Sequence, residues 1–153
     1  MAAAFKGSPP ALASLHQQAD RLLTGGVGAF DARLHALRGY PVVINKWASW
    51  CDPCQTEFPV FQRLAVTYGR RVAFLGIDGK DMNASAAAFL RRFPVTYPSY
   101  VDPQEQIASS IKAATYYPLT VFVAPSGAVD HLHAGPYETA AQLERDLERY
   151  ALR

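Results

Sequence analysis

The residues in this sequence best suited to chemistry are two cysteines three positions apart, Cys51 and Cys54. They follow a short β-branched run, 42–44, bounded by Gly39 and Pro41, which is typical of a strand covered on both faces. A helix that begins near Cys51 directs unpaired backbone N–H groups and the positive end of its dipole at the sulfur, which favours the thiolate. We therefore expect Cys51 to be the nucleophile. Cys54, one turn later and facing inward, suits the resolving thiol that closes a disulfide with it.

These are the only two cysteines among 153 residues, so the chain lacks the several bridges of a small disulfide-stapled domain. An inert local disulfide and a structural zinc site stay open as alternatives to redox chemistry. Zinc usually takes four ligands, and His131 and His133, which alternate along an expected strand, could complete a set with the cysteines. We interpret both histidines as exposed strand residues and predict no metal.

The stretch Trp50-Cys51-Asp52-Pro53-Cys54 resembles the active site of thioredoxins. The longer segment 45–59 is similar to the TlpA/ResA branch of membrane-tethered thiol-disulfide oxidoreductases, and the similarity extends from about Gly39 to the last helix. This resemblance implies an α/β chain with the three-layer thioredoxin fold: a mixed central sheet with helices on both faces, plus an N-terminal helical extension and a TlpA/ResA-type insertion. It also implies no cofactor beyond the redox-active disulfide.

The same resemblance assigns roles around the cysteines. Pro118 stands where the family has a cis-proline against the cysteine pair, and Tyr117 where the backbone pairs with substrate. An ordinary trans proline that opens a strand is the alternative. Trp50 and Pro53 would shape the site, because Pro53 lacks an N–H and fixes the first turn of the helix.

Glu57 is the candidate acid, three residues after Cys54 on the same expected helix. The resemblance places here a glutamate that lines the cavity near the cysteines and assists proton handling. A partly buried carboxyl with a raised pKa could accept the proton of Cys54, whereas a solvated helix glutamate is the alternative. Asp52 adds a negative charge that opposes thiolate formation, which favours a reductant.

Three residues depart from the family pattern. Asn45 stands where thioredoxin has a buried aspartate, and an asparagine cannot titrate, so Glu57 must supply any acid. Lys46 replaces the usual aromatic residue, and a lysine in a central strand must find a partner or extend its charge to water. Tyr117 is bulkier than the common residue before the cis-proline, so substrate choice could differ from that of the relatives.

Hydrophobic periodicity and turn residues predict the order of elements. We expect an N-terminal extension, 1–38, packed on a thioredoxin-like domain, 39–153. The expected helices span 11–23, a short segment around 30–37, 51–68, 84–93, 102–113 and 139–152, and the expected extended segments and strands span 41–47, 72–77, 94–101, 116–123 and 129–134. The glycine-rich segment 25–28 should end the first helix.

The composition limits the kinds of partner and the cellular location that we expect. Half of the residues are apolar and 18% are charged, the formal net charge is only +2, and nothing indicates nucleic-acid binding. No stretch approaches the about 20 apolar residues of a membrane span, and the start does not resemble a signal peptide. The resemblance implies an extracytoplasmic protein, in the periplasm or on the outer face of the cytoplasmic membrane, whose signal or anchor segment is not in this chain.

We therefore predict a thiol-disulfide oxidoreductase that reduces protein disulfides outside the cytoplasm, as in cytochrome c maturation. Its expected partners are a protein disulfide or dithiol and a membrane or thioredoxin-type thiol donor, and the chain is expected to be a monomer. The alternatives are an oxidant that introduces disulfides and a non-catalytic binding module. The latter would present an aromatic loop to a partner, formed by Tyr97, Tyr100, Tyr116 and Tyr117.

Overall fold

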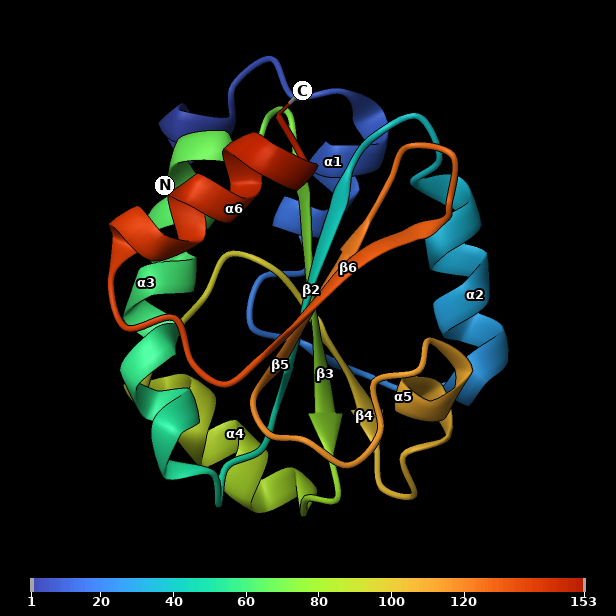
Figure 1. Ribbon diagram of the computed structural model, residues 1–153, viewed down its shortest axis with the longest axis vertical. Helices are drawn as coiled ribbons and strands as arrows, with labels where there is room; N and C mark the ends of the chain where they lie inside the picture. The colour runs from blue at the N-terminus through green and yellow to red at the C-terminus, as the bar shows by residue number, and fades with distance from the viewer. Residues whose placement is uncertain (1, 153) are drawn as a thin grey trace.

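A six-stranded mixed sheet forms the centre of the molecule in a computed structural model that describes residues 2–152 (Figure 1). The strand order is β1-β4-β3-β2-β5-β6. The first four strands in this order are parallel, and β5 is antiparallel to both β2 and β6. The strands are β1 (Leu22–Leu23), β2 (Val42–Trp47), β3 (Ala73–Gly79), β4 (Ser99–Asp102), β5 (Leu119–Val123) and β6 (Val129–Ala134).

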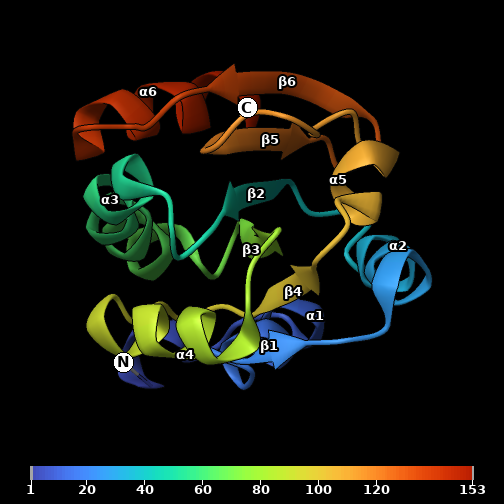
Figure 2. The same ribbon diagram turned by 90° about the horizontal axis from the view of Figure 1, so that it is seen from below.

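Helices cover both faces of this sheet, as Figure 2 shows, with α3, α4 and α6 on one side and α2 and α5 on the other. The buried side chains accordingly form two apolar clusters, one on each face. The predicted three-layer thioredoxin architecture is therefore confirmed. The helices are η1 (Ala2–Phe5, a 3₁₀ turn), α1 (Pro10–His16), α2 (Gly26–Ala36), α3 (Asp52–Tyr68), α4 (Asn83–Arg92), α5 (Gln106–Ser110) and α6 (Ala140–Tyr150).

Strand β2 is buried along its whole length and leads directly to the cysteines. Its side chains alternate between the faces, so Val43 and Trp47 join the cluster under α3 while Val42 and Ile44 join the opposite one. A strand covered on both faces reads as a continuous apolar run, which is why the sequence predicted it correctly. Among the described residues, no helix has the length and apolar character needed to cross a bilayer.

The prediction of a helix over 11–23 is wrong in its second half. Helix α1 ends at His16, and Leu22–Leu23 form β1, paired in parallel with Ser99 and Tyr100. Residues 17–20 form a turn after the helix. At its end Asp20 has a φ of 62°, donates its N–H to the carbonyl of Tyr97 at 3.2 Å and accepts the Val95 N–H on its carboxylate at 2.7 Å. Sheet pairing thus overrides the helical spacing of the leucines.

The glycines near the second helix also have a different role from the predicted one. Gly25, with a φ of 109°, precedes α2, and Gly26 to Gly28 lie inside that helix rather than ending the first one. The predicted second helix around 30–37 is nonetheless present, with Phe30 fully buried. Left-handed backbone at Gly25 turns the chain from β1 into α2, a conformation that glycine adopts without steric cost.

The helix predicted from Asp102 to residue 113 is shorter than expected. Asp102 is the last residue of β4, and α5 spans only Gln106–Ser110. The Asp102 carboxylate nevertheless caps the N-terminus of this helix, because it accepts hydrogen bonds from the N–H groups of Ile107 and Ala108, each at 2.9 Å. It thereby satisfies donors that a helix start leaves unpaired.

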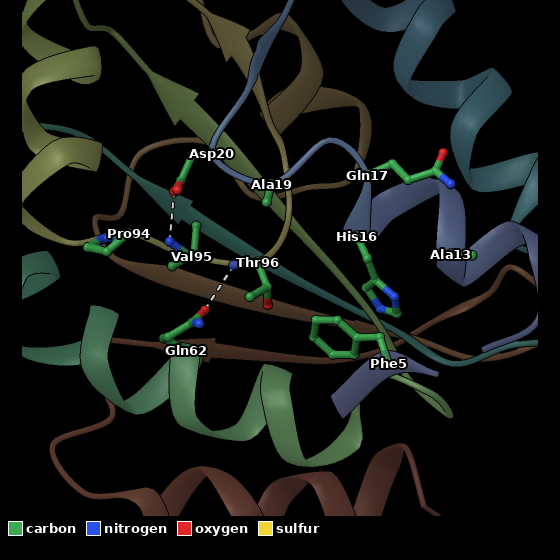
Figure 3. A pocket seen from close by; sticks show the side chains of 10 residues that line it. All are labelled: Phe5, Ala13, His16, Gln17, Ala19, Asp20, Gln62, Pro94, Val95 and Thr96. Carbon is green, nitrogen blue, oxygen red and sulfur yellow. Dashed lines mark hydrogen bonds between the residues drawn. The ribbon is translucent and has the colours of Figure 1, made fainter. Parts of the chain in front are cut away.

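The loop before β4 is fixed by two side chains that reach it from different elements (Figure 3). Asp20 binds the amide of Val95, and Gln62 of α3 accepts the Thr96 N–H at 2.9 Å. These residues line a hollow of about 630 Å³ between the N-terminal segment and this loop. Neither cysteine lines this hollow, which is therefore separate from the candidate site. Its lining also includes Phe5 and His16, whose rings stack, and Ala13, Gln17, Ala19 and Pro94.

Candidate active site

The two cysteines form a disulfide at the start of α3. Cys51 caps the helix in an extended conformation, with φ −92° and ψ 105°, and the Cα atoms of Cys51 and Cys54 lie 5.4 Å apart. Cys54 is fully buried, whereas 4% of Cys51 is exposed. Pro53 occupies the first turn of α3 and is exposed. The less buried cysteine is therefore the one at the helix N-terminus, where the dipole favours a thiolate.

Pro118 lies at the same end of the sheet as the cysteines. The peptide bond between Tyr117 and Pro118 is cis, as predicted. The next residue, Leu119, pairs with Lys46 of β2, and β2 continues from there toward Cys51. The antiparallel register thus places the start of β5 beside the end of β2.

Trp50 and Tyr117 form an aromatic edge next to the cysteines. Their ring centroids lie 4.7 Å apart, and the Trp50 indole N–H donates to the carbonyl of Lys80 at 2.8 Å. Trp50 is 54% exposed although this bond fixes its position. An exposed ring held in place beside a reactive sulfur provides apolar surface for a substrate chain.

Glu57 is fully buried one helical turn after Cys54, so the alternative of a solvated glutamate is wrong. Its Oε2 accepts the N–H of Tyr137 at 3.1 Å, while Oε1 has no partner among the residues that the structure describes. Burial raises the pKa of Glu57 to about 8, and the Tyr137 amide opposes this shift only in part. The carboxyl is therefore mostly protonated at neutral pH and loses its proton as the pH rises through about 8.

Lys46 and Tyr117, two departures from the family pattern, share one carboxylate. The Lys46 ammonium lies 2.6 Å from Glu105 Oε2, donates to the carbonyl of Ala113 at 2.7 Å and stands 4.0 Å above the Tyr117 ring. The Tyr117 hydroxyl donates to the same Glu105 oxygen at 2.9 Å. Lys80 contacts the other oxygen at 3.2 Å. The buried lysine has found a partner, and that partner also orients the residue before the cis-proline.

The charge of Glu105 and the small size of Gly79 both favour the contacts between Glu105, Lys46 and Tyr117. Burial would raise the pKa of Glu105, but hydrogen bonds from Lys46, Tyr117 and Lys80 outweigh it and lower this pKa to about 2. Burial and the Glu105 carboxylate raise the pKa of the Tyr117 hydroxyl, which therefore remains a donor. Gly79 leaves room for it, because a Cβ there would lie 2.2 Å from the hydroxyl oxygen. No sequence pattern indicated Glu105, since only the fold brings it to β2.

Two aspartates that sequence reasoning also missed hold the loop before Cys51. Asp81 accepts the backbone N–H of Ser49 at 2.7 Å and its hydroxyl at 2.6 Å. Burial opposes ionisation of Asp81, but its bonds with Asp78 and Ser49 dominate and lower its pKa. Burial, together with Asp81, raises the pKa of Asp78 to about 9. One proton is thus held by Asp78 while an ionised Asp81 anchors the loop.

The geometry defines a class of protein: a thioredoxin-like chain with a disulfide at the start of a sheet-covering helix and a cis-proline at the facing strand. A profile of the AhpC/TSA family matches residues 23–132, which is more than half of the sequence. The chain therefore belongs to the AhpC/TSA family. The predicted membership of the thioredoxin superfamily is confirmed.

Named relatives are thiol-disulfide enzymes. The thiol-disulfide oxidoreductase ResA of Geobacillus kaustophilus is 31% identical over 119 residues, covering 77% of this chain and 67% of ResA. A thiol:disulfide interchange protein DsbE homolog of Paracoccus denitrificans is 34% identical over 95 residues, covering 61% of this chain and 50% of that protein. The predicted resemblance to the ResA branch is thus confirmed, although the chain spans only half of the DsbE homolog.

Solved structures agree with the fold. The structure of MTB dsbF in its mixed oxidized and reduced forms has a TM-score of 0.69 and 30% sequence identity, and the match covers 76% of this chain and 85% of that one. A DsbF homologue from Corynebacterium diphtheriae also has a TM-score of 0.69, with 25% identity and coverage of 76% and 75%. Each likeness covers about three quarters of this chain.

Proposed function

We propose that this protein is a thiol-disulfide oxidoreductase that reduces disulfides of proteins outside the cytoplasm, as in cytochrome c maturation. The observation that carries the proposal is the Cys51–Cys54 disulfide at the N-terminus of α3, in which Cys54 is fully buried and Cys51 keeps 4% of its surface exposed. The names of the relatives support the activity, and their ResA and DsbE types support the setting. The redox-active disulfide supplies the chemistry.

The reaction exchanges one disulfide for another. The Cys51 thiolate attacks a sulfur of the substrate disulfide, and a mixed disulfide forms while the other substrate sulfur leaves as a thiolate. Cys54, as a thiolate, then attacks the Cys51 sulfur and releases the second substrate thiolate. The substrate gains two electrons, and the enzyme ends with the Cys51–Cys54 disulfide. A membrane or thioredoxin-type dithiol returns it to the reduced form by the reverse exchange.

In this mechanism Glu57 accepts the proton of the buried Cys54 thiol. Cys54 must lose its proton to attack, yet it is fully buried and cannot pass that proton directly to water. The Glu57 carboxyl lies one turn away on α3 and has a pKa of about 8, close to that of an ordinary thiol, so transfer between them is nearly balanced. Once the carboxyl is ionised, as it becomes when the pH approaches 8, its unpaired Oε1 is the oxygen that can accept this proton.

The substrate chain would lie along the aromatic edge and the cis-proline. The backbone of Tyr117 pairs with the substrate, while Trp50 and Pro53 provide exposed surface beside Cys51. Pro118 keeps this strand start free of a competing N–H. Asp52, exposed in the first turn of α3, opposes the Cys51 thiolate and favours the reducing direction.

Cysteine variants test this assignment with a disulfide-bonded peptide as substrate. Cys54→Ser should accumulate a mixed disulfide through Cys51, visible by mass spectrometry, because the resolving thiol is missing. Cys51→Ser should form no adduct and show no turnover. Adducts through Cys54 in the Cys51→Ser protein at the same rate, or turnover in both variants, would refute the assigned roles.

A further inference from the structure

Three potential metal ligands meet on the outer side of the sheet, between β6 and α6. His131 and His133 alternate along β6 and therefore share a face, and Asp146 of α6 lies opposite them. One ligand atom from each residue lies within 4.8 Å of the other two. All three residues are partly exposed, so an ion can reach them from solvent. Among the described residues this cluster contains neither cysteine.

The distances suit a single ion after small side-chain movements. Ligands at about 2.0–2.2 Å from zinc in a tetrahedron lie about 3.4 Å from one another. His133 Nδ1 and Asp146 Oδ2 are already 3.9 Å apart. The remaining separations, up to 4.8 Å, need to shorten by at most about 1.4 Å, which side-chain rotation at a partly exposed surface can supply.

Neighbouring groups hold the ligands in place. The His131 ring stacks on Tyr150 with centroids 4.2 Å apart, and the His133 ring stacks on Tyr137 at 4.0 Å. Stacking covers the ring faces and leaves the ring nitrogens, which lie in the ring plane, at the open edge of each ring. His133 also has a hydrogen bond with the backbone of Pro136, as metal-binding histidines often do through the nitrogen that does not coordinate. The Tyr137 hydroxyl donates to Asp146 Oδ2 at 2.6 Å and so orients the carboxylate, as an outer-shell partner does in metal sites.

Space for a further ligand is present beside the cluster. A hollow of about 230 Å³ is lined by His133, Asp146, Tyr137 and Arg145, with Pro136 and Gln142. Arg145 is the cation there, but its side chain is exposed and can move into solvent. Three protein ligands with an open fourth position form a zinc coordination type that proteins use.

We propose that His131, His133 and Asp146 bind one divalent transition-metal ion of the zinc class. Two imidazoles and a carboxylate favour Zn²⁺ or Cu²⁺ over Mg²⁺ or Ca²⁺, which prefer oxygen ligands. The site is distinct from the redox pair. Tyr137 connects the proposed metal site to the surroundings of the redox pair, because its hydroxyl donates to Asp146 and its backbone N–H donates to Glu57.

Calorimetric titration of Zn²⁺ into the oxidised protein at neutral pH tests the proposal. The closed Cys51–Cys54 disulfide offers no thiolate, so binding must use other ligands. We expect one ion per chain. His131→Gln, His133→Gln and Asp146→Asn should each weaken binding by about tenfold or more. His35→Gln removes an exposed histidine on α2 and is the matched control, which should bind as the wild type does.

A second measurement needs no variant. Zn²⁺ should shift the NMR signals of the His131 and His133 rings while those of His16 and His35 stay in place. Absence of binding to the oxidised protein would overturn the proposal. So would equal affinity in wild type and the His131→Gln and His133→Gln variants, because the ion would then occupy a different site.

Discussion

Glu57 combines two properties that a proton-transfer group needs. Its carboxyl is shielded from water, which raises its pKa to about 8, and it keeps one oxygen unpaired within the described part of the chain. Because Asn45 in the neighbouring strand β2 cannot titrate, it cannot substitute for this acid. We therefore propose Glu57 as the acid that passes a proton to or from Cys54.

Replacing Glu57 by glutamine should slow disulfide exchange by about tenfold or more, since an amide cannot accept the Cys54 proton. The decrease is measured by stopped-flow reduction of a disulfide peptide. The pH profile separates this role from a structural one: the wild-type rate should titrate near pH 8, and the Glu57→Gln rate should not.

Glu148→Gln is the matched control, because Glu148 is an exposed glutamate on α6. Its rate and pH profile should equal those of the wild type. If Glu57→Gln reacts at the wild-type rate across the pH range, Glu57 has no part in the mechanism.

At the scale of elements, one carboxylate joins three segments that are distant in sequence. Glu105 precedes α5, Lys46 belongs to β2 and Tyr117 begins the approach to β5. Lys46 is fully buried, so its charge has no access to water and depends on Glu105 and the Ala113 carbonyl. The ion pair thus fixes the segment that would contact substrate.

Glu105→Gln should lower the free energy of unfolding by about 3 kcal/mol, because breaking a buried pair leaves one charge uncompensated. Adding Lys46→Met to it should recover most of this loss, since neither charge then remains. Urea unfolding of both single variants and the double variant measures the coupling. Equal and additive losses, with no recovery in the double variant, would show that the pair is not coupled.

The elements differ in how far the sequence alone could predict them. Continuous apolar runs identified β2 and β3, and Thr139 marked the start of α6, where it forms a capping box with Gln142. The two-residue strand β1 was missed, because only pairing with β4 makes it a strand. The cysteine pair followed from a local motif and the cis-proline from the family resemblance, whereas Glu105, Asp78 and Asp81 reach the site only through the fold.

At the scale of the whole molecule, buried acids make stability depend on pH. The pKa of Glu57 is raised from 4.5 to about 8, and that of Asp78 from 3.8 to about 9. The folded state therefore binds more protons than the unfolded state between these values. Stability from these groups is fully present below the unfolded pKa values and is lost as the pH rises through the folded ones.

The free energy of unfolding of the oxidised protein should therefore fall between about pH 4.5 and pH 8 to 9. In Glu57→Gln, position 57 no longer binds a proton on folding. The slope of its free energy of unfolding against pH, between pH 4.5 and about 8, should therefore be smaller by up to about 1.4 kcal/mol per pH unit. Urea unfolding at a series of pH values measures both slopes. Parallel curves for the two proteins would contradict the raised pKa.

The reduction potential of the Cys51–Cys54 couple tests the central claim, a protein-disulfide reductant, most directly. The fluorescence of Trp47 and Trp50, which lie close to the pair in sequence, can follow a dithiothreitol redox series. We predict a value of about −250 mV or lower, near the roughly −270 mV of thioredoxin. A value near the roughly −120 mV of a strong disulfide donor, or no redox transition at all, would contradict the account.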